Sequence, residues 1–187
     1  PIPVLTGDLA ATIDGDFTDW DKAGVEYRDT IGDTIHRDYP GYGGLHYKDD
    51  SGRNDIATCK LLVSEKDIGF YVETKDALTP YTNPNWMLLL IDADNDHGTG
   101  WFDYDFIVNK RVVDAKTTTV LRYDGKAWIQ AARVRYAAKG NRLELAIPRT
   151  LLGLDDRDAF AFDFHWADNV AALDTPISLC THGDSAP

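Results

Sequence analysis

Short segments of alternating apolar and polar residues, separated by turn residues, recur along most of the chain. Such segments are typical of β-strands with one buried face. Asp124-Gly125 stands between two of them and is a strong signal for a two-residue hairpin turn. Residues 86–91 form a continuous apolar run, which is typical of a central strand buried on both faces. The expected strands are residues 55–63, 68–74, 86–91, 103–109, 118–123, 126–132, 133–137, 141–147, 159–166 and 177–180.

Roughly ten strands, with turns about every eight to twelve residues, predict an all-β fold. We expect an antiparallel β-sandwich with immunoglobulin- or jelly-roll-like layering and one short helix. That helix is expected at residues 148–153, because proline suits the first turn of a helix and glycine its end. Residues 27–54 break the rhythm, being rich in Gly, Asp, Tyr and His, and loops this long are usually functional or ordered by another group. Without a repeat or linker, the chain is expected to be a single domain over residues 1–187.

The charge of the chain changes this picture mainly by excluding partners. The 187 residues include 31 acidic and 19 basic ones, for a net charge of −12, and 27 of the acidic residues are Asp. A chain this acidic argues against binding a nucleic-acid backbone or an anionic membrane surface. No run approaches about eighteen apolar residues, so we expect no membrane span. Hydrophobic content of 43% is ample for a packed core.

The start of the chain and its two cysteines give less information about function. The chain begins at Pro1 without an initiator Met, and we expect a module cut from a longer, secreted protein. Cys59 and Cys180 fit either one disulfide or two buried thiols, and the sequence does not decide between them.

The most informative stretch is residues 92–105, which carries five Asp in fourteen residues between two expected strands. Carboxylates this close repel one another unless a cation neutralises them, and hard oxygen ligands in a flexible loop favour Ca²⁺ over Mg²⁺. The spacing is similar to a helical calcium-binding loop, but His97 replaces its sixth-position glycine and neither flank reads as a helix. The alternatives are a solvated acidic turn and, for Asp105, a capping or pairing role elsewhere. The expected metal ligands are Asp92, Asp94, Asp96, Asp103 and Asp105.

Several separated segments together resemble the family 9 carbohydrate-binding modules and the broader DOMON-like β-sandwich group. They are Ile13-Asp14-Gly15-Asp16-Phe17-Thr18-Asp19-Trp20 near the start, the hairpin ending at Asp76, and residues 86–96, 141–148 and 161–169. The resemblance implies a calcium-stabilised, non-catalytic sandwich attached to a secreted or cell-surface (or periplasmic) bacterial enzyme that degrades polysaccharide. In founding members two tryptophans hold a terminal sugar. The nearest counterparts of the first are Tyr81 and Trp86, while nothing after Trp166 is aromatic.

Flat aromatic rings beside polar side chains suit the apolar faces of sugars, although most such rings in β-sandwiches belong to the core. The tyrosines of the long loop, Tyr39, Tyr42 and Tyr47, are further candidates. The candidate carbohydrate-binding residues are Tyr81, Trp86, Trp101, Trp166 and Asn169.

Catalytic motifs are missing from the sequence: it has no Gly-x-Ser-x-Gly or His-Glu-x-x-His, and its histidines show no zinc spacing. We therefore expect a non-catalytic module that binds a polysaccharide or oligosaccharide and targets an attached catalytic domain. The alternative is a structural or interaction module without sugar binding. Sugar binding predicts exposed aromatic rings around a concave surface, whereas a structural role predicts buried ones. Sulfated or uronic-acid polymers are disfavoured by the negative charge, unless calcium bridges them or a local basic patch exists.

Overall fold

The computed structural model describes residues 4–34, 37–40, 46–155, 160–169 and 184–186. Strands dominate these residues, and the two helices are short. The helices are the 3-10 helix η1 (Phe17–Lys22) and the α-helix α1 (Arg149–Leu152). The strands are β1 (Val4–Leu5), β2 (Val25–Arg28), β3 (Arg37–Pro40), β4 (His46–Asp49), β5 (Ile56–Ser64), β6 (Asp67–Thr74), β7 (Leu88–Asp92), β8 (Phe106–Asp114), β9 (Thr117–Tyr123), β10 (Trp128–Lys139), β11 (Arg142–Pro148), β12 (Asp163–Asp168) and β13 (Asp184–Ala186).

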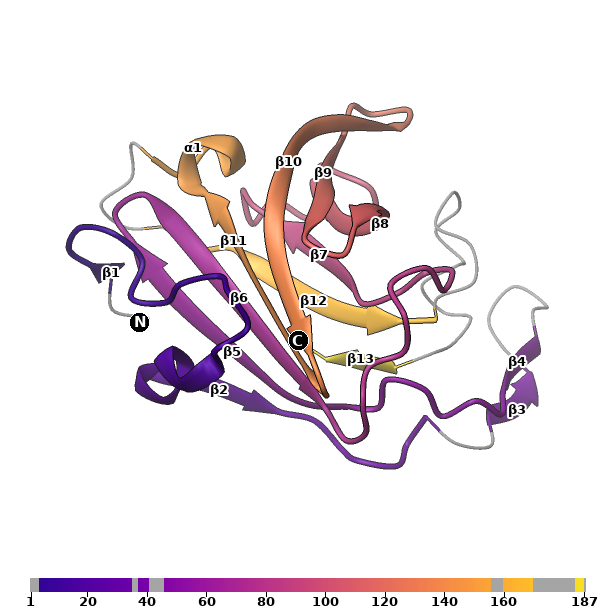
Figure 1. Ribbon diagram of the computed structural model, residues 1–187. Coiled ribbons are helices and arrows are strands. Elements are labelled where there is room, and N and C mark those ends of the chain that lie inside the picture. Colours follow the sequence, from indigo (N-terminus) through magenta and orange to yellow (C-terminus); the bar gives the residue numbers. More distant parts are fainter. Residues whose placement is uncertain (1–3, 35–36, 41–45, 156–159, 170–183, 187) are drawn as a thin grey trace.

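Eleven strands of the described chain form one continuous, strongly curled sheet (Figure 1). Their order is β1-β5-β6-β11-β10-β9-β8-β7-β12-β13, with β2 also paired to β5. β1 pairs with β5 in parallel and the other pairs are antiparallel, so the sheet is mixed. The predicted mostly β fold with a short helix is confirmed. The described strands form one curled, mixed sheet, and two clearly separate antiparallel layers are not seen.

The twelve-residue strand β10 joins the two halves of the sheet. Its first part pairs with β9 as far as Arg135, and its last part pairs with β11 from Tyr136 onward. The register shifts between Gln130 and Ala132, and such a bulge bends a strand and increases its twist. The sequence predicted two strands here, 126–132 and 133–137, because the bulge interrupts the alternation. One bent strand therefore takes the place of the two predicted strands, and it pairs antiparallel both with β9 and, across the turn at residues 140–141, with β11.

The main core lies inside this curl, between the two halves of the sheet. Phe70 and Leu145 come from one half, and Leu89, Val108 and Trp166 from the other, and all five are fully buried. A smaller apolar cluster lies on the opposite, outer face of the second half, where Trp101 covers Leu88 and Leu90. The sheet is therefore apolar on both faces around β7, as its continuous apolar run predicted.

A buried carboxylate attaches the N-terminal segment to the sheet. Glu144 of β11 is fully buried and accepts hydrogen bonds from the backbone N–H groups of Asp14 and Gly15, at 2.9 and 2.7 Å. Its other oxygen accepts from Trp20 Nε1 at 2.6 Å. Residues 14–20 are thus anchored to β11 through this side chain, and Phe17 and Trp20 also pack against Tyr71.

Other expectations have mixed outcomes. Residues 27–54 contain the end of β2 and the β3–β4 hairpin, so part of the expected loop is ordered as strands. Cys59 is buried, while Cys180 and the expected strand 177–180 lie outside the described residues. No helix in the described ranges is long and apolar enough to cross a membrane.

Candidate cation site and aromatic pocket

The acidic loop connects β7 to β8, and its two ends are fixed by the sheet. Asp92 is the last residue of β7, and the backbone N–H of Asp105 donates to the carbonyl of Ile91 at 2.9 Å. The Asp105 carbonyl in turn accepts from the N–H of Tyr123 at 2.8 Å. Asp92 and Asp105 are therefore neighbours across adjacent strands, although thirteen positions separate them in sequence.

Three of the predicted ligands come together at this point. Asp92, Asp94 and Asp105 each offer one carboxylate oxygen, and these oxygens lie within 4.8 Å of one another. Asp92 is only 2% exposed, and its Oδ2 is buried without a hydrogen-bond partner in the described part of the chain. Asp105 is half-buried and Asp94 is exposed. The group thus runs from the sheet edge to the surface, with an unpaired anionic oxygen at its inner end.

The remaining oxygens of the group are held by the loop backbone. Asp92 Oδ1 accepts from the N–H of Asn95 at 2.7 Å, and Asp105 Oδ2 accepts from the N–H of Ala93 at 3.0 Å. Asp94 accepts from the Thr99 hydroxyl at 3.2 and 3.1 Å. These hydrogen bonds hold the three carboxylates in place without a bound ligand.

Burial and mutual repulsion make the charged form of this group costly. Burial is the main cause that raises the pKa of Asp92, and the charges of Asp105 and Asp94 raise it further, against the hydrogen bond from Asn95. Burial likewise raises the pKa of Asp105, again assisted by Asp94. A divalent cation would relieve both effects, because it supplies opposite charge where desolvation is greatest.

Asp96 and Asp103, also predicted as ligands, are not part of this three-carboxylate group. Asp96 Oδ1 accepts from the N–H of Gly98 at 2.9 Å and closes the local turn. Asp103 lies 3.3 Å from His97 Nδ1 and has a φ of +75° within a tight turn that ends at Tyr104. These turns direct the two side chains to local partners.

All three tryptophans that were predicted to bind sugar are in the interior. Trp86, Trp101 and Trp166 are 2%, 5% and 0% exposed, so none presents a ring face to solvent. Trp166 belongs to the main core, and Trp101 packs against Trp128 at a centroid distance of 5.9 Å on the outer face. Asn169 donates from Nδ2 to Asp49 Oδ2 at 3.1 Å. The candidates of the long loop cannot be placed, since Tyr42 and the side chains of Tyr39 and Tyr47 lie outside the description.

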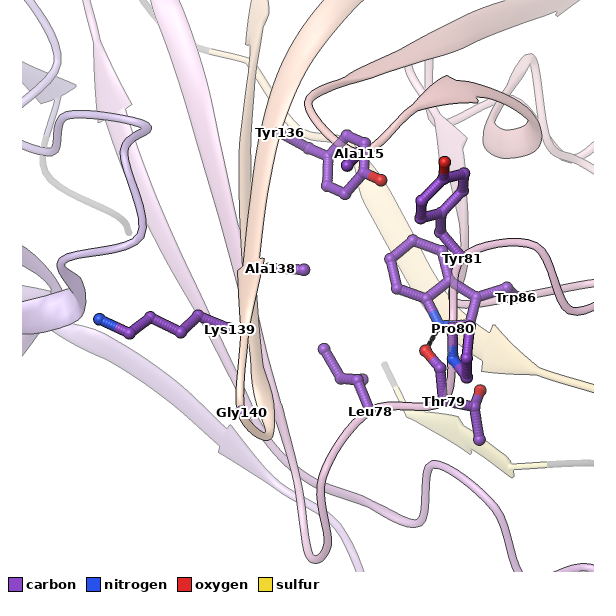
Figure 2. A pocket seen from close by; sticks show the side chains of 10 residues that line it. All are labelled: Leu78, Thr79, Pro80, Tyr81, Trp86, Ala115, Tyr136, Ala138, Lys139 and Gly140. Carbon is purple, nitrogen blue, oxygen red and sulfur yellow. Dashed lines mark hydrogen bonds between the residues drawn. The ribbon is translucent and has the colours of Figure 1, made fainter.

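Tyr81 and Trp86 instead border an open pocket of about 210 Å³ between the β6–β7 connection and the end of β10 (Figure 2). In Figure 2 the rings of Tyr81 and Trp86 lie next to each other, and Tyr136 and Ala138 face them from β10. Tyr81 is half-buried, whereas Trp86 is only 2% exposed and its Nε1 donates to the Thr79 carbonyl at 2.8 Å. The lining residues are Leu78, Thr79, Pro80, Tyr81, Trp86, Ala115, Tyr136, Ala138, Lys139 and Gly140.

Tyr136 is the aromatic residue of the pocket that the sequence did not indicate. It alternates within a strand and reads as core, and it is indeed only 2% exposed. Its hydroxyl donates to the Asp114 carbonyl at 2.9 Å, and its ring meets Trp86 edge-on at 5.8 Å. Burial, assisted by the neighbouring Tyr81 and Asp114, raises the pKa of Tyr136 to about 12, so the hydroxyl stays protonated. The one sequence feature that could have indicated Tyr136 as a pocket residue is its position near the hairpin turn at the end of β10.

Comparison of the chain with protein-family models, curated proteins and solved structures finds no match.

Proposed function

We propose that the chain is a non-catalytic carbohydrate-binding module stabilised by Ca²⁺ at Asp92, Asp94 and Asp105. The observation that carries the proposal is the buried Asp92 Oδ2, which has no hydrogen-bond partner in the described residues and lies beside two further carboxylates. A buried anionic oxygen left unpaired is costly, and a metal ion is the partner that suits it best. The resemblance of several segments to family 9 modules supports the same reading. In this proposal the two halves of the curled sheet act as the layers of a β-sandwich.

The separations within the group suit calcium. Ca²⁺ binds oxygen at about 2.3–2.6 Å, so two ligands of one ion lie at most about 5.2 Å apart. The three oxygens lie within 4.8 Å of one another and meet this limit without rearrangement. The remaining positions would be filled by water or carbonyl oxygens, which calcium accepts in variable number while Mg²⁺ demands near-ideal octahedral geometry. Bound calcium would supply positive charge and hold the β7–β8 connection in place.

The pocket beside Tyr81 is the proposed site for the end of a glycan chain. Its volume of about 210 Å³ is small, so a single sugar ring is the appropriate occupant. The half-buried ring of Tyr81 offers an apolar surface to sugar C–H groups. The module would then target an attached catalytic domain of a secreted or cell-surface enzyme to its polysaccharide.

The test is a binding screen with a variant in the pocket. Affinity gels containing neutral and acidic polysaccharides should retard the wild-type chain on at least one polymer. Tyr81→Ala should weaken that binding by about fivefold or more, since stacking on one aromatic ring is worth roughly 1 kcal/mol or more. Tyr27→Ala, which removes a 36% exposed ring on β2, is the matched control and should bind normally. Normal binding by Tyr81→Ala would remove the pocket from the proposal.

The alternative is a structural or interaction module that does not bind sugar. It is favoured by one observation, the burial of Trp86, Trp101 and Trp166. This alternative predicts no retardation on any polymer, together with calcium-dependent stability. The gel screen therefore separates the two functions without involving the cation site.

A further inference from the structure

The basic residues of this acidic chain are concentrated in one part of the sheet. Residues 106–139, which cover β8, β9 and β10, contain eight basic and two acidic residues. The rest of the chain contains eleven basic and twenty-nine acidic residues. The net charge of the whole chain therefore hides a positive region of +6 beside a remainder of −18.

The middle of β10 presents arginines on the outer face of the sheet. Val134 belongs to the main core, and the alternation of a strand turns Arg133 and Arg135 to the opposite side, where both are exposed. Arg133 is opposite Thr119 on β9, whose hydroxyl donates to the carbonyl of Arg111 on β8 at 2.8 Å. The exposed Arg111 thus lies on the strand next to β9, two strands away from Arg133.

None of these three arginines forms an ion pair among the described residues. Arg133 and Arg135 are two residues apart along one strand, or about 7 Å, and Arg111 lies about 10 Å away across two strand spacings. Three guanidinium groups that have no ion pair among the described residues can bind several anionic groups at once. Arginine binds carboxylates and sulfates through two parallel hydrogen bonds, which gives geometric selectivity.

The same face continues from the arginines into a polar and aromatic region. Gln130 is exposed, and Trp128 and Tyr123 are half-buried, with their ring centroids 5.3 Å apart. Register places Trp128 opposite Tyr123 and Gln130 opposite Leu121, whose side chain belongs to the outer apolar cluster, so these residues share the outer face. Rings for sugar C–H faces, an amide for hydroxyl groups and arginines for acidic groups therefore follow one another along a single strand.

We propose that the outer face of β8 to β10 binds a polysaccharide that carries carboxylate or sulfate groups, through Trp128, Gln130, Arg133 and Arg135 of β10 and Arg111 of β8. The inference rests on the proposed carbohydrate-binding function and adds the class of glycan. The surface is separate from the Tyr81 pocket, because Tyr136 and Ala138 face that pocket from the inner side of β10. The net charge of the chain disfavours acidic polymers, but this local positive region is the basic patch that would allow them to bind. The large negative remainder of the chain disfavours duplex DNA, whose charge density is much higher, as the partner.

The experiment compares two charge-matched double variants. Affinity electrophoresis and calorimetric titration are carried out with polygalacturonate and heparin as acidic polymers, hydroxyethylcellulose as a neutral one, and duplex DNA. Arg133→Ala/Arg135→Ala should lose at least about tenfold in affinity for an acidic polymer, as expected for charge-assisted hydrogen bonds. Lys22→Ala/Arg28→Ala removes the same charge from η1 and β2 and should change affinity by less than about twofold. Arg133→Lys/Arg135→Lys should fall between them, because lysine keeps the charge but not the paired hydrogen bonds.

The outcomes separate this inference from the proposed function. Binding to neutral polymer alone, with loss in Tyr81→Ala, overturns the inference and leaves the function standing. Failure to bind any polysaccharide overturns both. Binding to acidic polymer that survives in Arg133→Ala/Arg135→Ala but disappears with a chelator is calcium-bridged at the acidic loop, and it overturns the assignment of this face. Equal or tighter binding of duplex DNA through the same arginines identifies a nucleic-acid surface and also overturns it.

Discussion

The substitution Asp92→Asn should change the stability of the chain in opposite directions depending on calcium. In the calcium-free chain it removes a buried negative charge beside Asp94 and Asp105, while the amide oxygen can still accept the hydrogen bond from Asn95. In the calcium-bound chain it removes the innermost ligand. The variant should therefore be more stable than wild type with a chelator and less stable with excess calcium.

The expected size follows from the separation of the carboxylates. At the limit of 4.8 Å, two unit charges repel by about 0.9 kcal/mol in a water-like dielectric and about 3.5 kcal/mol at an effective dielectric of 20. Because Asp94 is exposed and Asp105 half-buried, the relief in Asp92→Asn should be about 1–2 kcal/mol. For a chain of this length that is a rise of about 2–4 °C in melting temperature per kcal/mol. Calcium at about a hundred times its dissociation constant should add about 2.7 kcal/mol to wild type alone.

The assay is thermal unfolding of both proteins, in EDTA and in a calcium series. Asp21→Asn, at an exposed position on η1, is the control for loss of one negative charge and should shift neither curve appreciably. Crossing of the wild-type and Asp92→Asn melting temperatures is the predicted result. Equal destabilisation by Asp92→Asn with and without calcium would refute the reasoning, because the carboxylate would then be only a local hydrogen-bond acceptor.

Three further predictions concern the same framework. Folding raises the pKa values of Asp92 and Asp105, so the calcium-free chain should gain stability as the pH falls from neutral toward the ordinary aspartate range. Calcium affinity should weaken over the same range, because protons compete for the carboxylates. Melting curves with and without chelator between about pH 4.5 and 7.5 measure both effects. Glu144→Gln should lower the free energy of unfolding in urea by about 2–4 kcal/mol. The buried Glu144 carboxylate accepts three hydrogen bonds, and an amide NH₂ in its place would face one of the donors. A decrease of less than about 0.5 kcal/mol would show that Glu144 does not anchor the N-terminal segment. Gly100→Ala should destabilise the chain and weaken calcium binding, since a Cβ there would lie 2.6 Å from a backbone oxygen at a φ of +69°. Gly125→Ala, with positive φ but open space, should cost only about 1–2 kcal/mol and leave calcium affinity unchanged.

The fold was predictable from the sequence where turn residues mark strand ends. The polar turn at residues 64–67 predicted the β5–β6 hairpin, and Asp124-Gly125 predicted the β9–β10 turn. The prediction failed along β10, where the bulge near Ala132 shifts the alternation by one residue. In a sequence such a shift looks like the end of a strand, although no turn residue stands there. The continuity of the sheet depends on that one strand and could not be foreseen.

The candidate site divides in the same way. The density of Asp residues predicted where carboxylates would gather, but not that only Asp92, Asp94 and Asp105 would meet, because local turns direct Asp96 and Asp103 elsewhere. The prediction of sugar-binding aromatic residues required that their rings be exposed. The alternation of residues along a strand does not predict exposure when both faces of the sheet are covered. Trp101 lies on the outer face and is nevertheless buried by its neighbours. The arginines of β10 were not predicted as a binding surface, because the overall charge of −12 does not show that one region of the chain has an excess of positive charge.

The central claim, that the carboxylates at the end of β7 hold a calcium ion, is tested most directly by calorimetric titration of decalcified protein with Ca²⁺. The account predicts saturable binding of one ion per chain in wild type, with proton release when the titration is made near the raised pKa values of Asp92 and Asp105. Asp92→Asn should abolish this binding while the chain remains folded by circular dichroism. Absence of calcium binding by folded wild-type protein, or unchanged binding by Asp92→Asn, would contradict the account.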